Sequence, residues 1–187
     1  MVSKSIAIIP ARHNSKGVKG KNFKLFNGKP LIKWTIDFVR SLDFVDHAMI
    51  SSNSKNIRKI AQDSDFNFIL RPENLSLDTS TTEECIIHAI NELSKKQIFF
   101  DNILIFEPTS PLREKKTVTN AFKFFKKKNL NSLMTVAKTD KLFANINKNK
   151  VIPIQKDTLR RRQERELLFY EVGVVYILKN DFFFKKK

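Results

Sequence analysis

Ser5-Ile6-Ala7-Ile8-Ile9-Pro10, residues 5–10, is the stretch that decides the fold. It is short, rich in β-branched residues and almost wholly apolar, which is typical of a strand buried on both faces of a parallel sheet. A polar loop follows over residues 11–29, and Pro30 then opens a segment with apolar residues at helical spacing. Proline suits the first turn of a helix because its missing N–H would have no partner there. The N-terminal region therefore predicts a strand, a long loop and a helix.

The same alternation continues along the chain. Short apolar runs predict strands, and longer segments with apolar residues three or four apart predict helices. This order predicts an α/β protein with a mostly parallel, Rossmann-like sheet in a three-layer α-β-α arrangement. We expect a single domain over residues 1–187, because this length allows one compact core and is short for two. The expected strands lie at residues 47–51, 67–70, 101–106, 132–137 and 168–178, the expected helices at 54–63, 79–95 and 114–128, and a hairpin at 143–146 and 151–154.

The composition bears on the cellular compartment of such a protein. The hydrophobic share of 41% is ordinary for a globular chain, and no apolar run approaches the ~20 residues of a membrane span. The N-terminus shows no secretory signal, and Cys85 is the single cysteine, so no internal disulfide forms. We therefore interpret the chain as cytoplasmic, with no membrane partner.

The net charge of +16 raises the question of a polyanionic partner. Most of the excess lies in the C-terminal half, in basic runs at residues 126–128, 160–162 and 185–187. A basic surface attracts triphosphates and acidic sugars as well as nucleic acids, and a charge run is also common on an ordinary solvated face. Aromatic residues are not interleaved with these runs as single-strand binding requires, so the pattern does not favour nucleic acid.

Chemistry is expected in the loops at the carboxyl ends of the strands, where parallel sheets bind ligands. The three relevant loops begin at Ala11, Arg71 and Glu107. The first of them lacks both the Gly-Lys-Ser/Thr ending of a P-loop and a Gly-x-Gly-x-x-Gly motif. It can be an ordinary basic turn or a phosphate-binding loop, since small residues let backbone N–H groups approach phosphate and cations neutralise it. The residues concerned are Arg12, Ser15, Lys16, Gly17, Lys19, Gly20 and Lys21.

Four ordered blocks resemble one known family. They are Ile8-Ile9-Pro10-Ala11-Arg12-x-x-Ser15-Lys16-Gly17 with Lys21-Asn22 and Gly28-Lys29-Pro30-Leu31-Ile32; Leu70-Arg71-Pro72 with Asp78-Thr79-Ser80; Glu107-Pro108-Thr109-Ser110-Pro111-Leu112-Arg113; and Arg162-Gln163 with Gly173 and Tyr176. In these blocks the chain resembles the acylneuraminate cytidylyltransferases, the CMP-sialic acid synthetases and their relatives for legionaminic and pseudaminic acids. The resemblance implies a sheet of the nucleotide-diphospho-sugar transferase type.

The resemblance also implies a reaction and a set of roles. The anomeric hydroxyl of an acidic nine-carbon (nonulosonic) sugar attacks the α-phosphate of CTP, which releases pyrophosphate and forms a CMP-sugar. Positioning and charge neutralisation carry such an in-line displacement. The family pattern assigns the catalytic role to Lys21 and Arg12, nucleotide binding to Ala11, Arg12, Ser15, Lys16, Lys21, Asn22, Arg71 and Thr82, and sugar binding to Glu107, Arg162 and Tyr170.

The match departs from the family pattern at the sugar side and at the C-terminus. Glu107 stands where the sialic-acid enzymes usually have glutamine, which indicates a nonulosonate other than N-acetylneuraminic acid. Tyr170-Glu171-Val172 replaces a stretch that usually ends in Asn-Gly. The family's Asp-x-Asp pair, which ligates Mg²⁺, lies beyond the equivalent of Asp181 and has no counterpart here. We therefore expect Mg²⁺ as cofactor with unidentified ligands, and a C-terminally truncated chain.

Several alternatives stay open. The chain can be a synthetase for the eight-carbon acid Kdo, or a catalytically impaired homologue that binds nucleotide or polyanion without turnover. The family commonly forms homodimers, and residues 140–165 are the expected dimerisation segment.

Packing explains Cys85 better than a nucleophilic role does, because apolar residues flank it on a helix. The expected apolar stripe of that helix is Thr82, Ile86, Ala89, Ile90 and Leu93. His13 lies inside the first loop, where its side chain can contact a ligand or have a structural role in the loop.

Overall fold

The computed structural model describes residues 3–13, 17–141, 143–154, 161 and 167–185. The chain divides into two compact units. The first comprises Met1–Thr135 and Gly173–Lys187, and the second comprises Val136–Val172. The prediction of a single domain over residues 1–187 stays a prediction.

The opening strand, β1 (Ser5–Pro10), lies inside a six-stranded sheet of order β5-β4-β1-β6-β10-β7. It pairs in parallel with β4 on one side and with β6 on the other. Its residues Ser5 to Ile9 are buried on both faces, as the apolar run predicts. β10 pairs antiparallel with β6, with Tyr176 opposite Ile105. The prediction of a mostly parallel sheet is therefore confirmed.

The elements follow the predicted alternation closely. Strands occupy β4 (His47–Ser52), β5 (Asn67–Leu70), β6 (Asn102–Ile105), β7 (Ser132–Thr139) and β10 (Leu168–Lys179). Helices occupy α1 (Leu31–Arg40), α2 (Lys55–Asp63), α3 (Thr82–Lys95), α4 (Lys115–Lys127) and α5 (Asn180–Lys185). Two short elements, η1 (Lys21–Phe23) and the ribbon of β2 (Leu25–Phe26) with β3 (Lys29–Pro30), lie inside the long first loop and were not predicted.

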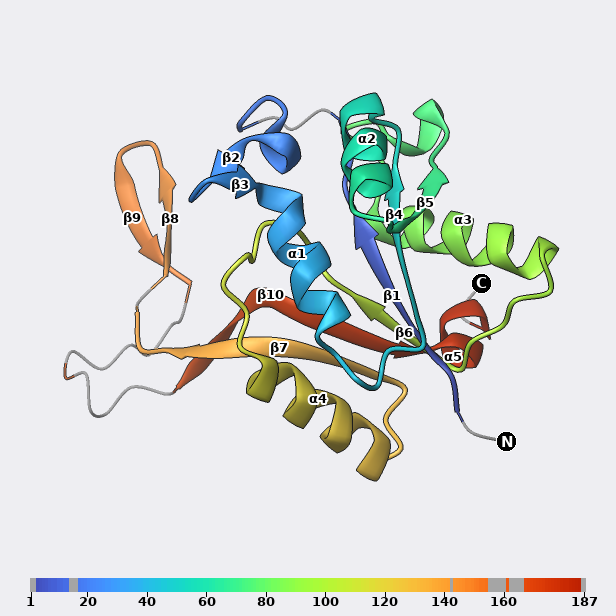
Figure 1. Ribbon diagram of the computed structural model, residues 1–187. Coiled ribbons are helices and arrows are strands. Elements are labelled where there is room, and N and C mark those ends of the chain that lie inside the picture. The colour runs from blue at the N-terminus through green and yellow to red at the C-terminus, as the bar shows by residue number, and fades with distance from the viewer. Residues whose placement is uncertain (1–2, 14–16, 142, 155–160, 162–166, 186–187) are drawn as a thin grey trace. The chain divides into compact units, whose positions relative to one another are not determined.

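The two faces of the sheet are covered by different helices (Figure 1). One core joins Ala7 and Ile9 of β1 to apolar residues of α1, α2 and α4. The other core joins Ile6 and Ile8 to residues of α3, with Phe183 and Phe184 of α5 packed against it. Because successive side chains of a strand point to opposite faces, one apolar run supplies both cores. The predicted three layers are present.

Helix α3 corrects one detail of the prediction. Thr81 caps the helix in a reciprocal capping box with Glu84, so the helix begins at Thr82 rather than at residue 79. Thr82 is exposed in the first turn and does not belong to the apolar stripe. Cys85 takes its place among the buried residues of this helix.

The second unit, Val136–Val172, contains the predicted hairpin. Its strands are β8 (Ala144–Asn147) and β9 (Lys150–Pro153), which pair antiparallel around Lys148 and Asn149, both with positive φ. Every residue of the two strands is exposed, including Ile146 and Val151. This hairpin therefore has little core of its own.

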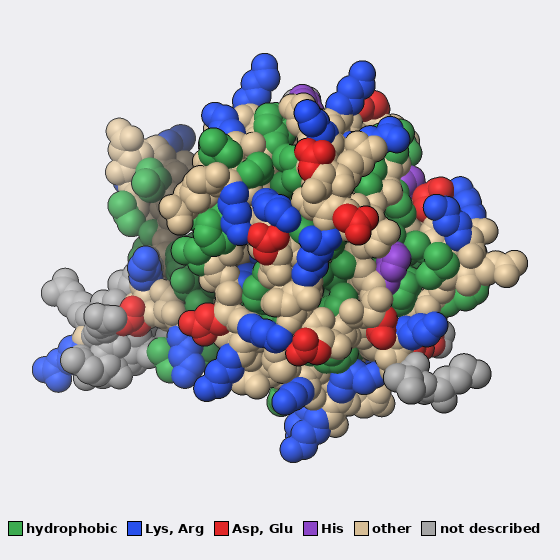
Figure 2. All heavy atoms as spheres, in the orientation of Figure 1, with side chains coloured by type: hydrophobic (Ala, Val, Ile, Leu, Met, Phe, Trp, Pro, Cys, Tyr) green, Lys and Arg blue, Asp and Glu red, His purple; other side chains and the backbone are tan. Residues whose placement is uncertain are grey.

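The distribution of surface charge and the character of the helices bear on polyanionic and membrane partners. Figure 2 shows Lys and Arg side chains scattered over the visible face with Asp and Glu between them, rather than gathered in one stripe. Within the described residues, no helix combines the length and apolar character that crossing a membrane requires.

Candidate active site

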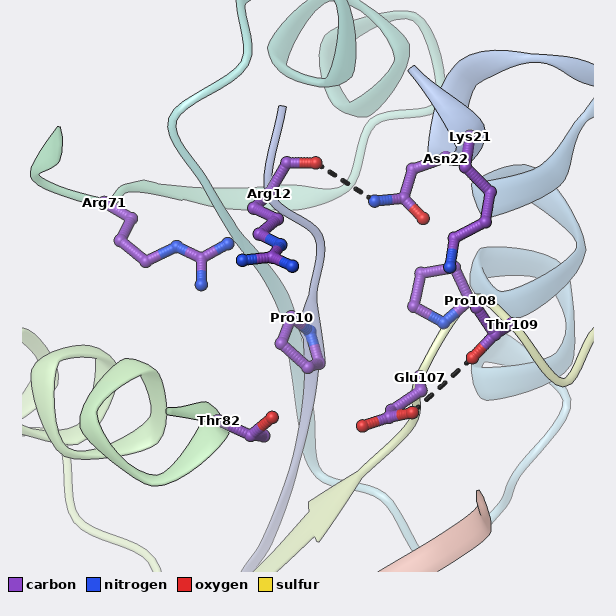
Figure 3. A pocket seen from close by; sticks show the side chains of 9 residues that line it. All are labelled: Pro10, Arg12, Lys21, Asn22, Arg71, Thr82, Glu107, Pro108 and Thr109. Carbon is purple, nitrogen blue, oxygen red and sulfur yellow. Dashed lines mark hydrogen bonds between the residues drawn. The ribbon is translucent and has the colours of Figure 1, made fainter. Parts of the chain in front are cut away.

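The loops that follow β1, β5 and β6 meet at one pocket, as the parallel sheet predicts. The first turn of α3 adds Thr82 to its wall. Figure 3 shows the side chains of three loops and one helix turned toward the same space. The residues that line it are Pro10, Arg12, Lys21, Asn22, Arg71, Thr82, Glu107, Pro108 and Thr109.

The first loop is fixed to the sheet at its start and folded on itself further along. The backbone N–H of Ala11 donates to the carbonyl of Ser51 on β4, at 3.0 Å. Gly20 has a φ of 65° and lies against the ring of Phe23, where a Cβ atom would stand 2.3 Å from Cζ. Only glycine fits such a position without displacing the ring. The turn at Gly20 begins η1, which carries Lys21 to the pocket.

Asn22 is buried within the same loop. Its amide nitrogen donates to the carbonyl of Arg12 at 3.1 Å (Figure 3), so this side chain joins the start of the loop to η1. The bond ties the backbone of Arg12 to the residue that follows Lys21, and both Arg12 and Lys21 line the pocket. Asn22 thus has a structural contact in addition to the nucleotide-binding role implied by the resemblance.

Arg12 links the first loop to the segment after β5. Its Nη1 atom lies 3.1 Å from Oδ1 of Asp78 and donates to the carbonyl of Leu77 at 2.9 Å. Both partners belong to the turn between Arg71 and α3. Sequence reasoning quoted Asp78 as part of a motif and gave it no role. The structure makes it the carboxylate that holds Arg12.

Arg71 is a buried cation with few partners. The residue is 6% exposed, its Nη2 atom donates to the carbonyl of Ser51 at a long 3.3 Å, and its Nε atom is buried without a hydrogen-bond partner. Burial lowers the pKa of Arg71, and the nearby charge of Arg12 lowers it further, while Cys85 opposes both. A guanidinium group in this state gains from any acceptor that a ligand brings into the pocket.

Glu107 supplies the carboxylate that lines this pocket. Thr109 donates to its Oε2 atom at 3.5 Å. The strand β10 comes close at Gly173, whose φ is 60°. A Cβ atom there would lie 3.6 Å from Ser110 Oγ, 3.6 Å from Tyr176 Oη and 3.8 Å from Glu107 Oε2. These are ordinary contact distances, so it is the positive φ of Gly173, rather than a lack of space, that favours glycine at this point.

Some predicted site residues are not placed at the pocket. Ser15, Lys16 and Arg162 lie outside the described residues. Tyr170 belongs to the Val136–Val172 unit and is 49% exposed. The sugar-binding role of Tyr170 stays a prediction.

His13 and Cys85 have structural contacts. The His13 backbone donates to Asn53 Oδ1 at 2.9 Å, its ring Nδ1 lies 3.1 Å from Ser54 Oγ, and the ring stacks on Phe23. The Cys85 thiol is buried and donates to Ser51 Oγ, and burial raises its pKa. A buried thiol with a raised pKa is a poor nucleophile, so packing explains Cys85.

A protein-made metal cage does not fit the described residues. Among them, no group of three or more His, Cys, Asp or Glu side chains is arranged to hold a metal ion. Mg²⁺ requires oxygen ligands, and among the described residues that line the pocket Glu107 alone has a carboxylate.

Sequence reasoning missed part of this site. Pro10, Pro108 and Thr109 line the pocket but were quoted only as motif residues. Arg113 lies behind the pocket wall and received no role, although it ends the Glu107 block. Its position at the end of a loop that carries a site residue was the one available signal.

A mostly parallel α/β sheet with a cationic pocket at the carboxyl ends of its strands is typical of proteins that bind nucleotides. The chain matches the family model described as cytidylyltransferase over residues 6–185. It therefore belongs to the cytidylyltransferase family.

Two curated relatives illustrate the range of this family. The chain is 35% identical over 122 residues to the CMP-N,N'-diacetyllegionaminic acid synthase of Legionella pneumophila, a match covering 65% of this chain and 53% of that protein. It is 26% identical over 194 residues to the pseudaminic acid cytidylyltransferase of Campylobacter jejuni, covering 97% of this chain and 84% of that protein. The chain thus spans about half the length of the Legionella relative.

A solved structure shows the same fold. The CMP:2-keto-3-deoxy-manno-octonic acid synthetase complexed with CTP superposes with a TM-score of 0.76 over 98% of this chain and 77% of that chain, at 15% identity. This likeness bears on the fold alone, and it confirms the predicted nucleotide-diphospho-sugar transferase type of sheet.

Proposed function

We propose that this protein transfers CMP from CTP to a nonulosonic acid sugar of the sialic type and releases pyrophosphate. The anomeric hydroxyl oxygen forms a bond to the α-phosphorus of CTP and loses its proton. The bond from that phosphorus to the bridging oxygen of the β-phosphate breaks, and pyrophosphate leaves with both electrons. No covalent intermediate with the protein is needed.

The observation that carries the proposal is the state of Arg71. A buried guanidinium with an unpartnered Nε is costly, and an acceptor from a ligand offsets that cost. A cytosine carbonyl or a phosphate oxygen is such an acceptor. Because the chain belongs to the cytidylyltransferase family, we infer that this ligand is CTP.

The cations of the first loop are proposed to hold the triphosphate. Lys21 reaches the pocket from η1, and Arg12 reaches it from the residues that follow β1. Charge grows on the phosphoryl oxygens and the leaving pyrophosphate in the transition state, and fixed cations stabilise it. We assign this catalytic role to Lys21, supported by Arg12, and phosphate contacts to Ala11, Ser15 and Lys16.

The remaining residues are proposed to hold the nucleoside and the sugar. Asn22, Arg71 and Thr82 are assigned to cytosine and ribose, and Arg162 to the sugar carboxylate, for which a planar guanidinium offers two parallel hydrogen bonds. Glu107 is assigned to a hydroxyl or amide of the sugar, since a carboxylate accepts hydrogen bonds and repels the sugar's own acid group. Tyr170 completes this set.

Magnesium is proposed to arrive with the triphosphate rather than in a cage made by the protein. Two observations support this: the triphosphate supplies oxygen ligands, and Glu107 is the one carboxylate among the described residues that line the pocket. The activity is accordingly expected to need added Mg²⁺ and to be lost with a chelator. The cytoplasm, where CTP chemistry and a free thiol such as Cys85 both fit, is the proposed compartment.

A homodimer is proposed as well, with residues 140–165 supplying the contact. The β8–β9 hairpin exposes 78% of Ile146 and 70% of Val151. Two large apolar side chains on a two-stranded hairpin are stabilised when another surface covers them. Sedimentation of the wild type and of Ile146→Lys tests this, and a wild type that stays monomeric at high concentration contradicts it.

The activity test is pyrophosphate release from CTP over a panel of acid sugars. We expect release with a legionaminic, pseudaminic or sialic acid, and less with the eight-carbon acid Kdo. Preference for Kdo would favour the Kdo synthetase alternative. Binding of CTP by calorimetry with no release on any sugar would favour the impaired homologue, whose polyanion binding would weaken steeply with salt.

A further inference from the structure

Arg113 is a buried charge that touches three separate elements. The residue is 9% exposed, and it follows the loop that leaves β6. Its Nε donates to the carbonyl of Val174 on β10 at 2.7 Å, its Nη1 donates to Thr35 Oγ1 on α1 at 3.2 Å, and its Nη2 donates to the carbonyl of Glu107. The guanidinium also lies over the ring of Phe106, 5.6 Å from its centroid. Arg113 thus joins the Glu107 loop to a strand and a helix.

The charge on Arg113 persists at neutral pH despite its burial. Loss of solvation lowers the pKa of Arg113 to about 10, and the Glu107 carboxylate opposes that shift. Burying a cation is expensive, and replacing it with a well-packed apolar side chain is often neutral or stabilising. Fold stability alone therefore does not account for an arginine here. A planar fork with separate donors can satisfy three acceptors in fixed directions, which lysine cannot do.

The acceptors of Arg113 lie beside the part of the pocket that we assign to the sugar. Val174 is next to Gly173, the point where β10 approaches Ser110 and the Glu107 carboxylate. The Glu107 carbonyl that receives Nη2 belongs to the residue whose carboxylate lines the pocket. Arg12 and Arg71, on the nucleotide side, contact Asp78, Leu77 and Ser51 instead.

We propose that Arg113 is a positioning residue that fixes the Glu107 loop against β10 and thereby sets the affinity and selectivity for the acid sugar. It acts through the backbone of Glu107 and touches no reacting atom. This proposal rests on the proposed function for its substrate, and on the contacts of Arg113 for its geometry. The nucleotide side of the pocket is held by other bonds, so CTP affinity does not depend on Arg113.

The chain offers a matched control for this test. Arg40 also donates to two carbonyls, those of Ser64 and Asp65, and lies over an aromatic ring, Phe66, at the same 5.6 Å. It ends α1 and does not line the pocket. Arg113→Lys and Arg40→Lys therefore each remove a guanidinium that donates to backbone carbonyls, one beside the pocket and one away from it. Thr35→Val, which removes one acceptor of Arg113, is a milder second variant.

The kinetic experiment compares CTP and sugar in all three variants. We expect Arg113→Lys to raise the KM for the acid sugar about tenfold, the size of one lost hydrogen bond to a charged group, and to leave the dissociation constant of CTP within about twofold. Thr35→Val should shift the same sugar KM in the same direction by less. Arg40→Lys should change neither. An equal loss of sugar and CTP affinity in Arg113→Lys would mean a general structural role and would overturn the proposal.

A second readout decides the matter without a sugar. Amide hydrogen exchange in Arg113→Lys should quicken in residues 107–112 and 173–175 and stay unchanged in residues 17–23 and 71–78, while Arg40→Lys leaves all four segments alone. Exchange that quickens everywhere, or in none of these segments, overturns the proposal. If the wild type turns over no acid sugar, the proposed function fails, and the exchange pattern still tests Arg113.

Discussion

The two sides of the pocket hold their charged groups in opposite ways. On the nucleotide side, Arg71 is a buried cation whose Nε has no partner. On the Glu107 side, the buried cation Arg113 uses Nε and both terminal nitrogens on protein acceptors. The first arrangement leaves hydrogen-bonding capacity for a ligand, and the second uses that capacity to fix a loop. A buried arginine therefore indicates ligand binding at Arg71 and loop positioning at Arg113. The number of protein acceptors that each guanidinium contacts distinguishes the two roles.

The largest expected effect comes from Lys21→Ala. If Lys21 stabilises charge in the transition state, turnover should fall by about 10²–10³, as when one stabilising donor is removed from an active site. Steady-state pyrophosphate release measures this. Lys24→Ala, which changes an exposed lysine beside η1, is the control and should keep its rate. Normal turnover in Lys21→Ala would remove this lysine from the reaction.

Arg71→Met sharpens the comparison between the two buried arginines. We expect CTP affinity to fall about tenfold or more, because a ligand acceptor loses its charged donor. The free energy of unfolding should hold or rise, because an under-partnered buried charge is replaced by an apolar side chain. Calorimetry and urea denaturation measure the two quantities, with Arg58→Met on the exposed face of α2 as control. Unchanged CTP affinity with a marked loss of stability would reverse our interpretation of Arg71.

Glu107→Gln tests the acidic side of the pocket. The carboxylate repels the acid group of the sugar, so we expect the KM for N-acetylneuraminic acid to fall roughly threefold, within the range of a solvent-accessible charge pair. The dissociation constant of CTP should not rise. Kinetics with several nonulosonic acids would show whether the preference among them changes. Glutamine keeps one acceptor oxygen for the sugar hydroxyl or amide, so a rise of all sugar KM values together would contradict the proposed repulsion.

The smallest expected effect concerns the first turn of α3, which adds Thr82 to the pocket. Thr81→Ala removes the cap that accepts from Glu84 N and should lower the free energy of unfolding by about 1 kcal/mol. Thr82 stays in the first turn, so CTP affinity should change by less than about twofold, well under the effect expected for a lost charged hydrogen bond. A large loss of CTP affinity would show that the cap itself orders the pocket.

Much of this arrangement could be predicted from the sequence, because it depends on local patterns. The apolar run of β1 and the periodicity of the helices place the strand ends, and with them the loops that carry Arg12, Arg71 and Glu107. The role of Arg113 could not be predicted in this way. Its acceptors Val174 and Thr35 lie 61 and 78 residues away, and a charged residue at the end of a loop ordinarily faces solvent.

The start of α3 and the turn at Gly20 were missed for a different reason. Periodicity alone placed Thr82 in an apolar stripe, whereas the capping box of Thr81 starts the helix there and leaves Thr82 exposed at the pocket. The left-handed backbone of Gly20 depends on the ring of Phe23 packed against it. Both features depend on side-chain contacts of single residues, which a hydrophobic pattern does not report.

Following the phosphorus atoms of CTP tests the central claim most directly. The protein is incubated with an acid sugar and CTP labelled either at the α-phosphate or at the γ-phosphate, and the products are separated. We predict that the α-label appears in a sugar nucleotide and the γ-label appears in pyrophosphate. A γ-label transferred to the sugar, or both labels left in hydrolysis products with no labelled sugar, would contradict the account.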